Sequence, residues 1–168
     1  NMGRYGAVQD YGMQLGSGTW DFWPSLTYNG EVDQYSWGGQ LSVIEPMQQV
    51  NASGYRKGTL FQATAWAGYD VLHWLRGGAR LLFVDQGAIT GAFAPSSLPN
   101  GLSDPVYNPQ NYGGRSLYVG FGLNPSVHDG PFAGNHFGVE WLQPVYQSYN
   151  GYQLSQNGYL YANWAYSF

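Results

Sequence analysis

The residues of this chain that could do chemistry are scattered polar side chains rather than a compact catalytic motif. A Ser–His–Asp arrangement would have to be assembled from distant positions, without a nucleophile-elbow sequence, and the chain contains no Cys. We therefore expect no enzyme activity and no bound cofactor. The candidates for another role, either lining a solute path or forming a hydrogen-bonded network that fills a narrow barrel, are Asp21, Gln40, Gln62, Thr64, Arg80, His136, Glu140 and Asn163.

Two smaller expectations concern the charged and metal-binding residue types. Arg80 is the expected partner of one of the acids. The histidines His73, His128 and His136 suggest a metal site, but none has a second ligand at i+2 or i+4, so we expect no metal.

The composition indicates that much of the surface does not face water. Charged residues make up 10% of the chain, against about 25% in an ordinary soluble domain, whereas there are 25 Gly, 7 Trp, 15 Tyr and 8 Phe. The net charge of −4 and the lack of an Arg/Lys cluster argue against nucleic acid as a partner. No run of about 18 apolar residues is present, which excludes a transmembrane helix but not transmembrane strands.

Period-two alternation of apolar and polar residues predicts about seven strands. The segments are 19–28, 34–43, 59–69, about 70–85, 116–124, about 136–146 and 158–168. Segments of about ten residues have the length that crosses a bilayer as a tilted strand. The expected fold class is therefore all-β, an antiparallel up-and-down transmembrane β-barrel.

Two hairpins have a predicted register. In the first, a turn at 29–33 pairs Tyr28 with Tyr35, which places the apolar residues of both strands on one face. In the second, a turn at 125–130 pairs Leu123 with Phe137 and sets Gly120 opposite Glu140, where the glycine leaves room for the acid.

Loop lengths give an independent test of a barrel. The predicted connections at 29–33, near 70 and at 125–134 are short, whereas those at 44–58, 86–114 and 147–157 are long. Outer-membrane barrels have short periplasmic turns and longer extracellular loops. The final strand ends on alternating aromatic residues, a pattern that the barrel-assembly machinery recognises, and its assembly-signal residues are Trp164, Tyr166 and Phe168.

Longer stretches of the sequence resemble a known family. The most specific is HFGVEWLQPVYQSYNGYQL followed by YLYANWAYSF, supported by YGMQLGSGTWDFWPSLTYNG and GYRKGTLFQATAWAG. They resemble the C-terminal half of bacterial outer-membrane transporters of the phenol-degradation-pathway type. Members of that family are roughly twice this length, so the resemblance implies that residues 1–168 are one barrel domain and the C-terminal portion of a longer chain. The start, NMGRYGAVQD, lacks a signal-peptide pattern, which fits a mature protein or a fragment.

The leading functional hypothesis is an outer-membrane channel for passive uptake or efflux of small molecules, with hydrophobic or aromatic ones among the candidates. Its partners would be membrane lipid, the barrel-assembly machinery and the solute, and a homo-oligomer or a partner protein stays open. One alternative is a plugged structural or partner-binding barrel. The other is a soluble carbohydrate-binding β-sandwich, for which the faces opposite the apolar ones carry unusually few Lys and Glu residues.

Overall fold

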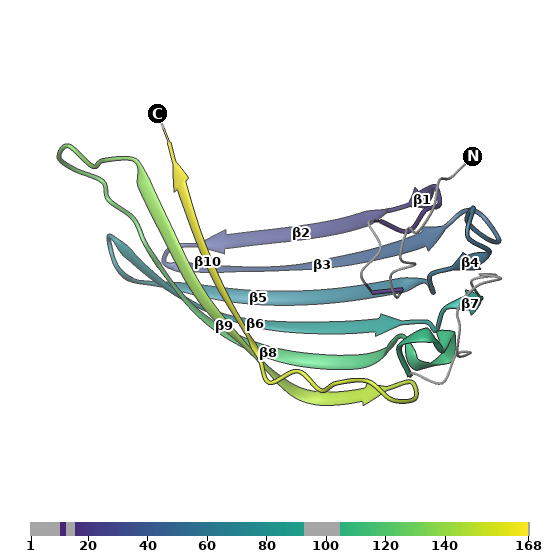
Figure 1. Cartoon of the computed structure of the whole chain (residues 1–168). Helices are drawn as coiled ribbons and strands as arrows, with labels where there is room; N and C mark the ends of the chain where they lie inside the picture. Colours follow the sequence, from purple (N-terminus) through teal and green to yellow (C-terminus); the bar gives the residue numbers. More distant parts are fainter. Residues whose placement is uncertain (1–10, 13–15, 93–104, 168) are drawn as a thin grey trace.

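The computed structural model describes residues 11–12, 16–92 and 105–167, most of which belong to one long antiparallel sheet (Figure 1). Successive long strands pair in an up-and-down meander, so the expected all-β antiparallel architecture is confirmed. No helix in the described part of the chain is long and apolar enough to cross a membrane. The sheet contains β1 (Asp21–Phe22) and β2 (Ser25–Val32), which both pair with β3 (Tyr35–Pro46), followed by β5 (Leu60–Leu72), β6 (Leu75–Gln86), β8 (Gly114–Pro125), β9 (Asn135–Tyr149) and β10 (Tyr159–Tyr166).

The sheet is strongly curved, but its described strands do not close into a barrel. Within the described residues, β2 pairs only with β3 and β10 only with β9. In Figure 1, β10 runs steeply across the direction of β2, β3 and β5. Residues of both outer strands line one cavity, so the sheet curls around one of its faces. The described strands therefore form an open curved sheet, and they do not by themselves make up the barrel of which the sequence predicts them to be a part.

The connections alternate between the two ends of the sheet, and the predicted division by length holds except that 126–134 and 150–158 have the same length, nine residues each. The turns at 33–34, 73–74 and 126–134 lie at one end, on the left of Figure 1, which we call the short-turn end. The connections at 47–59 and 150–158 and the described residues of the connection at 87–113 lie at the other, the long-loop end. The long connections contain a two-stranded sheet of β4 (Tyr55–Arg56) and β7 (Thr90–Gly91), and the 3-10 helices η1 (Pro105–Tyr107) and η2 (Pro109–Asn111).

The register predicted for the first hairpin is wrong by four residues. Tyr28 pairs with Gly39 instead of Tyr35, because β2 continues through Asn29 and Gly30 to a tight turn at 33–34. Asp33 in that turn has a φ of 51°, a left-handed conformation that Asp tolerates. Gly30 serves packing and not a turn, since a Cβ there would lie 2.6 Å from Cε2 of Trp37. The shift is even, so every side chain stays on its predicted face.

The second hairpin is displaced by two residues from the prediction. Leu123 pairs with Val139, and Glu140 lies opposite Gly122. The turn closes through hydrogen bonds from the Val127 N–H to the Asn135 carbonyl and from the Gly134 N–H to the Val127 carbonyl, both 2.8 Å. The faces are again preserved.

The two faces of the sheet differ sharply in chemistry. One, the apolar face, is exposed: Leu26, Phe121 and Trp164 retain 72%, 65% and 67% of their accessible surface. On this face the charged residues of the described strands lie only at the long-loop end, and they are Glu45, Asp85 and Arg115. The opposite, polar face contains the charged residues Asp21, Glu31, Asp70, Arg76, Arg80 and Glu140.

The small hydrophobic core lies beside the long loops instead of on a face of the sheet. Tyr11, Tyr55 and Ile89 are buried together, and Tyr112 packs against them. The rings of Tyr11 and Tyr55 meet edge to face, with centroids 4.9 Å apart. This cluster packs β4 and its neighbours against the connection after β6, and it leaves the apolar face of the sheet uncovered.

Two adjacent glycines on β3 provide a stability test of the sheet. A Cβ at Gly38 would lie 2.6 Å from Cε2 of Trp66 and 2.7 Å from the Tyr28 carbonyl, whereas one at Gly39 would meet its nearest atom, the Thr64 carbonyl, at 3.4 Å. We expect Gly38→Ala to lower the free energy of unfolding by about 1–3 kcal/mol. The control Gly39→Ala should change it by less than about 0.5 kcal/mol. Urea unfolding of the full-length protein in detergent measures both, and equal effects would contradict the packing described.

Candidate functional site

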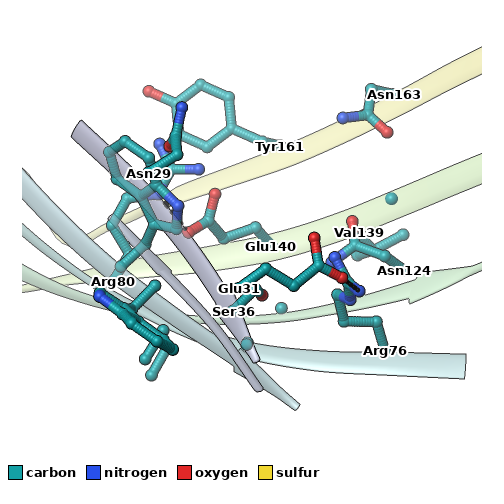
Figure 2. Close-up of a pocket in the computed structure, with 18 of the residues that line it drawn as sticks. Asn29, Glu31, Ser36, Arg76, Arg80, Asn124, Val139, Glu140, Tyr161 and Asn163 are labelled. Carbon is teal, nitrogen blue, oxygen red and sulfur yellow. Dashed lines mark ion pairs between the residues drawn. The ribbon is translucent and has the colours of Figure 1, made fainter. Parts of the chain in front are cut away.

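A cavity of about 470 Å³ lies on the polar face near the middle of the sheet (Figure 2). Its floor is largely glycine: Gly68, Gly78 and Gly122 are consecutive partners across β5, β6 and β8. Because glycine has no side chain, this row leaves space that longer residues on either side can enter. At the two ends of the same row lie Glu31 on β2 and Glu140 on β9.

Arg80 and Glu140 form an ion pair across this floor. The Arg80 Nε lies 2.9 Å from Oε1 of Glu140, and the two side chains are 43% and 20% exposed. They come from β6 and β9, which are separated by β8. Gly120 on β8 lies beneath them, since a Cβ there would be 2.9 Å from the same Glu140 oxygen. The expected pairing of Arg80 with an acid is therefore present. Gly120 does leave space for the Glu140 side chain, as predicted, although its direct partner on β9 is Leu142.

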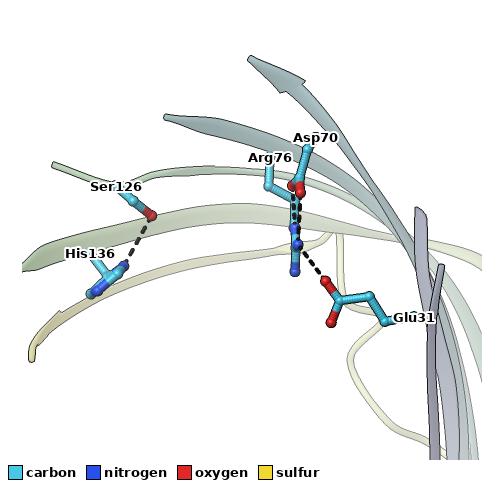
Figure 3. Close-up of polar contacts among 5 residues, drawn as sticks. All are labelled: Glu31, Asp70, Arg76, Ser126 and His136. Carbon is cyan, nitrogen blue, oxygen red and sulfur yellow. Dashed lines mark hydrogen bonds and ion pairs between the residues drawn. The ribbon is translucent and has the colours of Figure 1, made fainter. Parts of the chain in front are cut away.

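Arg76 joins strands that are not neighbours (Figure 3). Its Nε and Nη2 donate to the two carboxylate oxygens of Asp70 at 2.5 and 3.0 Å. Nη2 also lies 3.6 Å from Oε1 of Glu31 on β2, although β3 and β5 separate β2 from β6. This contact reaches across the concave face from β6 to β2. It is possible because small residues such as Ser36 on β3 and Gly68 on β5 lie beneath it.

Two further cavities extend this space along the polar face. One of about 720 Å³ lies at the short-turn end and shares Arg76, Asn124 and Asn163 with the central cavity. Another of about 420 Å³ lies toward the long-loop end and shares Tyr161. The three cavities therefore follow each other from one end of the sheet to the other.

The structure brings five of the eight predicted polar residues to these cavities. Arg80, Glu140 and Asn163 line the central cavity, His136 the one at the short-turn end and Gln62 the one toward the long loops. The Nδ1 atom of His136 lies 3.0 Å from Oγ of Ser126, a contact that ties β9 to its preceding turn (Figure 3).

The other three are held in local hydrogen bonds. The Gln40 amide donates to Oγ1 of Thr27 at 2.9 Å, and Oγ1 of Thr64 donates to the Leu81 carbonyl at 3.0 Å. Asp21 accepts from Ser17 and Thr19 at 2.7 and 2.6 Å.

The aromatic residues predicted to guide assembly lie on the apolar face of β10. Trp164 is exposed and its Nε1 donates to Oδ1 of Asn135 at 2.7 Å, while Tyr166 is the last residue of the strand and is 55% exposed. Phe168 lies outside the described residues.

Sequence reasoning missed Glu31, Asp70 and Arg76, which together form the largest charged group of the site. Glu31 and Asp70 were expected in turns. The overlooked signal was that the alternation of Leu26 and Tyr28 continues to Val32, which keeps Glu31 in a strand and on the polar face.

The side chains around the central cavity offer both hydrogen-bond donors and acceptors. Two guanidinium groups, the carboxylates of Glu31 and Glu140, and the amides of Asn29, Asn124 and Asn163 line the central cavity. Among the described residues, no three His, Cys, Asp or Glu side chains are grouped so that they could hold a metal ion together. No family model, curated protein or solved structure matches this chain.

Two ion pairs with the same Nε–oxygen distance but different exposure test how much the central pair contributes to the free energy of unfolding. The Arg115 Nε lies 2.9 Å from Oδ2 of Asp85 on the apolar face, and these side chains are 65% and 36% exposed. We expect Arg80→Met to cost about 1–3 kcal/mol of unfolding free energy, because it leaves the more buried Glu140 unpaired. Arg115→Met should cost less than about 1 kcal/mol. Parallel urea titrations measure the two, and a loss at Arg115 as large as that at Arg80 would argue against a stabilising role for the central pair.

Proposed function

We propose that this chain is the C-terminal part of a bacterial outer-membrane β-barrel through which small molecules diffuse along the polar face. Membrane lipid would cover the apolar face, and the barrel-assembly machinery would insert the protein by recognising the aromatic end of β10. The resemblance of the sequence to outer-membrane transporters of the phenol-degradation-pathway type motivates the solute class, small molecules including hydrophobic or aromatic ones. The proposal involves no bound cofactor and no energy coupling.

The observation that carries the proposal is the segregation of charge between the two faces. On β5 the apolar face runs from Phe61 to Val71 without a charged residue. At about 3.3 Å per residue this is roughly 33 Å along the strand, or about 25 Å across a bilayer for a strand tilted by 40°. That height matches the apolar band of outer-membrane barrels. The charges Glu45, Asp85 and Arg115 mark the edge of the band at the long-loop end.

Tyr and Trp side chains at the short-turn end support the proposal that the second edge of the apolar band lies there. Tyr35 and Tyr69 pair across β3 and β5 with ring centroids 4.9 Å apart. Trp164 and Tyr166 lie on the same face of β10. Aromatic rings with a polar tip are favoured where hydrocarbon meets water.

The polar face supports a solute path because its three cavities adjoin one another. In a bilayer, the outer edges of β2 and β10 would need partner strands, because unpaired backbone groups cannot face lipid. The proposal therefore includes further strands that complete the wall around this path.

The proposal is tested by ion flux through the full-length protein in planar bilayers. We expect conductance, and we expect Arg80→Gln to shift the reversal potential in a KCl gradient toward cation preference, because it removes a positive charge from the polar face. The matched control Arg115→Gln removes the same charge from the apolar face and should leave the potential unchanged.

Each outcome bears on the proposal. A shift in Arg80→Gln alone supports a path along the polar face, and equal shifts in both variants would contradict it. The complete absence of conductance and of solute flux in vesicles would overturn conduction and favour the plugged barrel.

A further inference from the structure

The chain's three histidines, which are distant in the sequence, line a single cavity at the short-turn end. His73 lies in the turn between β5 and β6, His128 in the turn before β9, and His136 on β9. The rings of His73 and His128 are the ones that approach each other, with centroids 6.4 Å apart and planes tilted by 35°. Spacing along the sequence could not reveal this pair, because it depends on the pairing of β6 with β8.

Backbone hydrogen bonds beside both residues hold the two turns together. The Ser126 N–H donates to the carbonyl of Trp74, the residue after His73, at 2.8 Å. The next residue, Val127, donates to the Asn135 carbonyl at 2.8 Å and so fixes the chain directly before His128. The backbone segments that carry the two imidazoles are therefore positioned by the sheet, which lowers the entropy cost of ordering the turns around a shared ligand.

The separation of the rings fits one metal ion bound between them. An imidazole nitrogen lies about 2.1 Å from a bound transition metal, so two imidazoles on one ion have centroids about 5–6.5 Å apart. The observed 6.4 Å lies in that range, near the arrangement in which the two ligands stand on opposite sides of the ion. A side-chain rotation within the exposed turns would bring them closer for a tetrahedral ion.

The charges around the pair favour a cation. Asp70 and Arg76 line the same cavity and neutralise each other, and Glu31, which lines the neighbouring central cavity, adds a negative charge 3.6 Å from Arg76. Asp129 directly follows His128 in the sequence. The sum of these four charges is negative.

We propose that His73 and His128 together bind a divalent transition-metal ion, Cu²⁺, Ni²⁺ or Zn²⁺, at the short-turn end of the polar face. Imidazole is a preferred ligand for these ions, with Cu²⁺ expected to bind most tightly. Water completes the coordination, because no third His, Cys, Asp or Glu joins the pair among the described residues. His136 is not assigned as a ligand, because no group of three such side chains forms among the described residues and its Nδ1 lies against Oγ of Ser126. Such an ion would link the turn that contains His73 to the turn that contains His128, and it would add positive charge at this end of the polar face. Its binding does not depend on conduction.

The test is Cu²⁺ binding to the full-length, tag-free protein in detergent, followed by calorimetry and by electron paramagnetic resonance. We expect a single site whose spectrum shows coupling to two imidazole nitrogens. Replacing either ligand, in His73→Ala or His128→Ala, should weaken binding by about tenfold or more and remove one nitrogen from the coupling pattern. His136→Ala is the matched control, since it removes a histidine from the same cavity without touching the pair.

The His73→Ala/His128→Ala double variant should lose the site while the heat-modifiable gel migration of the folded protein is retained. Unchanged Cu²⁺ affinity and spectrum in the folded double variant would overturn the assignment. A loss in His136→Ala equal to that in His73→Ala would likewise show that the ligands are not the proposed pair. Neither result would bear on ion flux, which is measured without metal.

Discussion

The alternation of side chains between the two faces of one sheet is the constraint on which the rest of this structure depends. Successive residues of a strand point to opposite faces, so a single layer of strands presents two continuous surfaces of different chemistry. Here many large side chains of the apolar surface are exposed, whereas the polar surface is concave and lined by ion pairs and amides. A sheet with one exposed apolar face and one polar face suits a wall between lipid and a polar interior.

Glycine and arginine act together to shape the polar face. The row of Gly68, Gly78 and Gly122 allows the sheet to curl closely, and the long side chains of Arg76 and Arg80 then reach acids on strands that are not their neighbours. Both arginines thus connect separate parts of the sheet, which side chains restricted to adjacent strands could not do. Because each is matched with an acid, the polar face contains charge without leaving either arginine unpaired.

The sequence predicted the faces more accurately than the pairing. Asn29–Gly30 has the composition of a hairpin turn, yet Gly30 lies within β2, where the ring of Trp37 occupies the space that a side chain would take. Both register errors were even, so Gln40, Arg80 and Glu140 still face as expected. The contact between Arg76 and Glu31 could not be predicted, because it depends on the curvature of the sheet. The approach of His73 to His128 could not be predicted either, because it depends on which turns the strand order brings together.

The central claim, that the apolar face meets lipid and the polar face meets water, is tested most directly by spin labels along β6. The chain has no Cys, so single cysteine substitutions from Ala79 to Val84 can be labelled one at a time in the full-length protein reconstituted in lipid vesicles. Collisions with oxygen, which concentrates in hydrocarbon, should be high at Ala79, Leu81 and Phe83 and low at the residues between them, and collisions with a water-soluble nickel chelate should show the opposite pattern. Accessibility without this two-residue period, or high nickel accessibility at Leu81, would contradict the account.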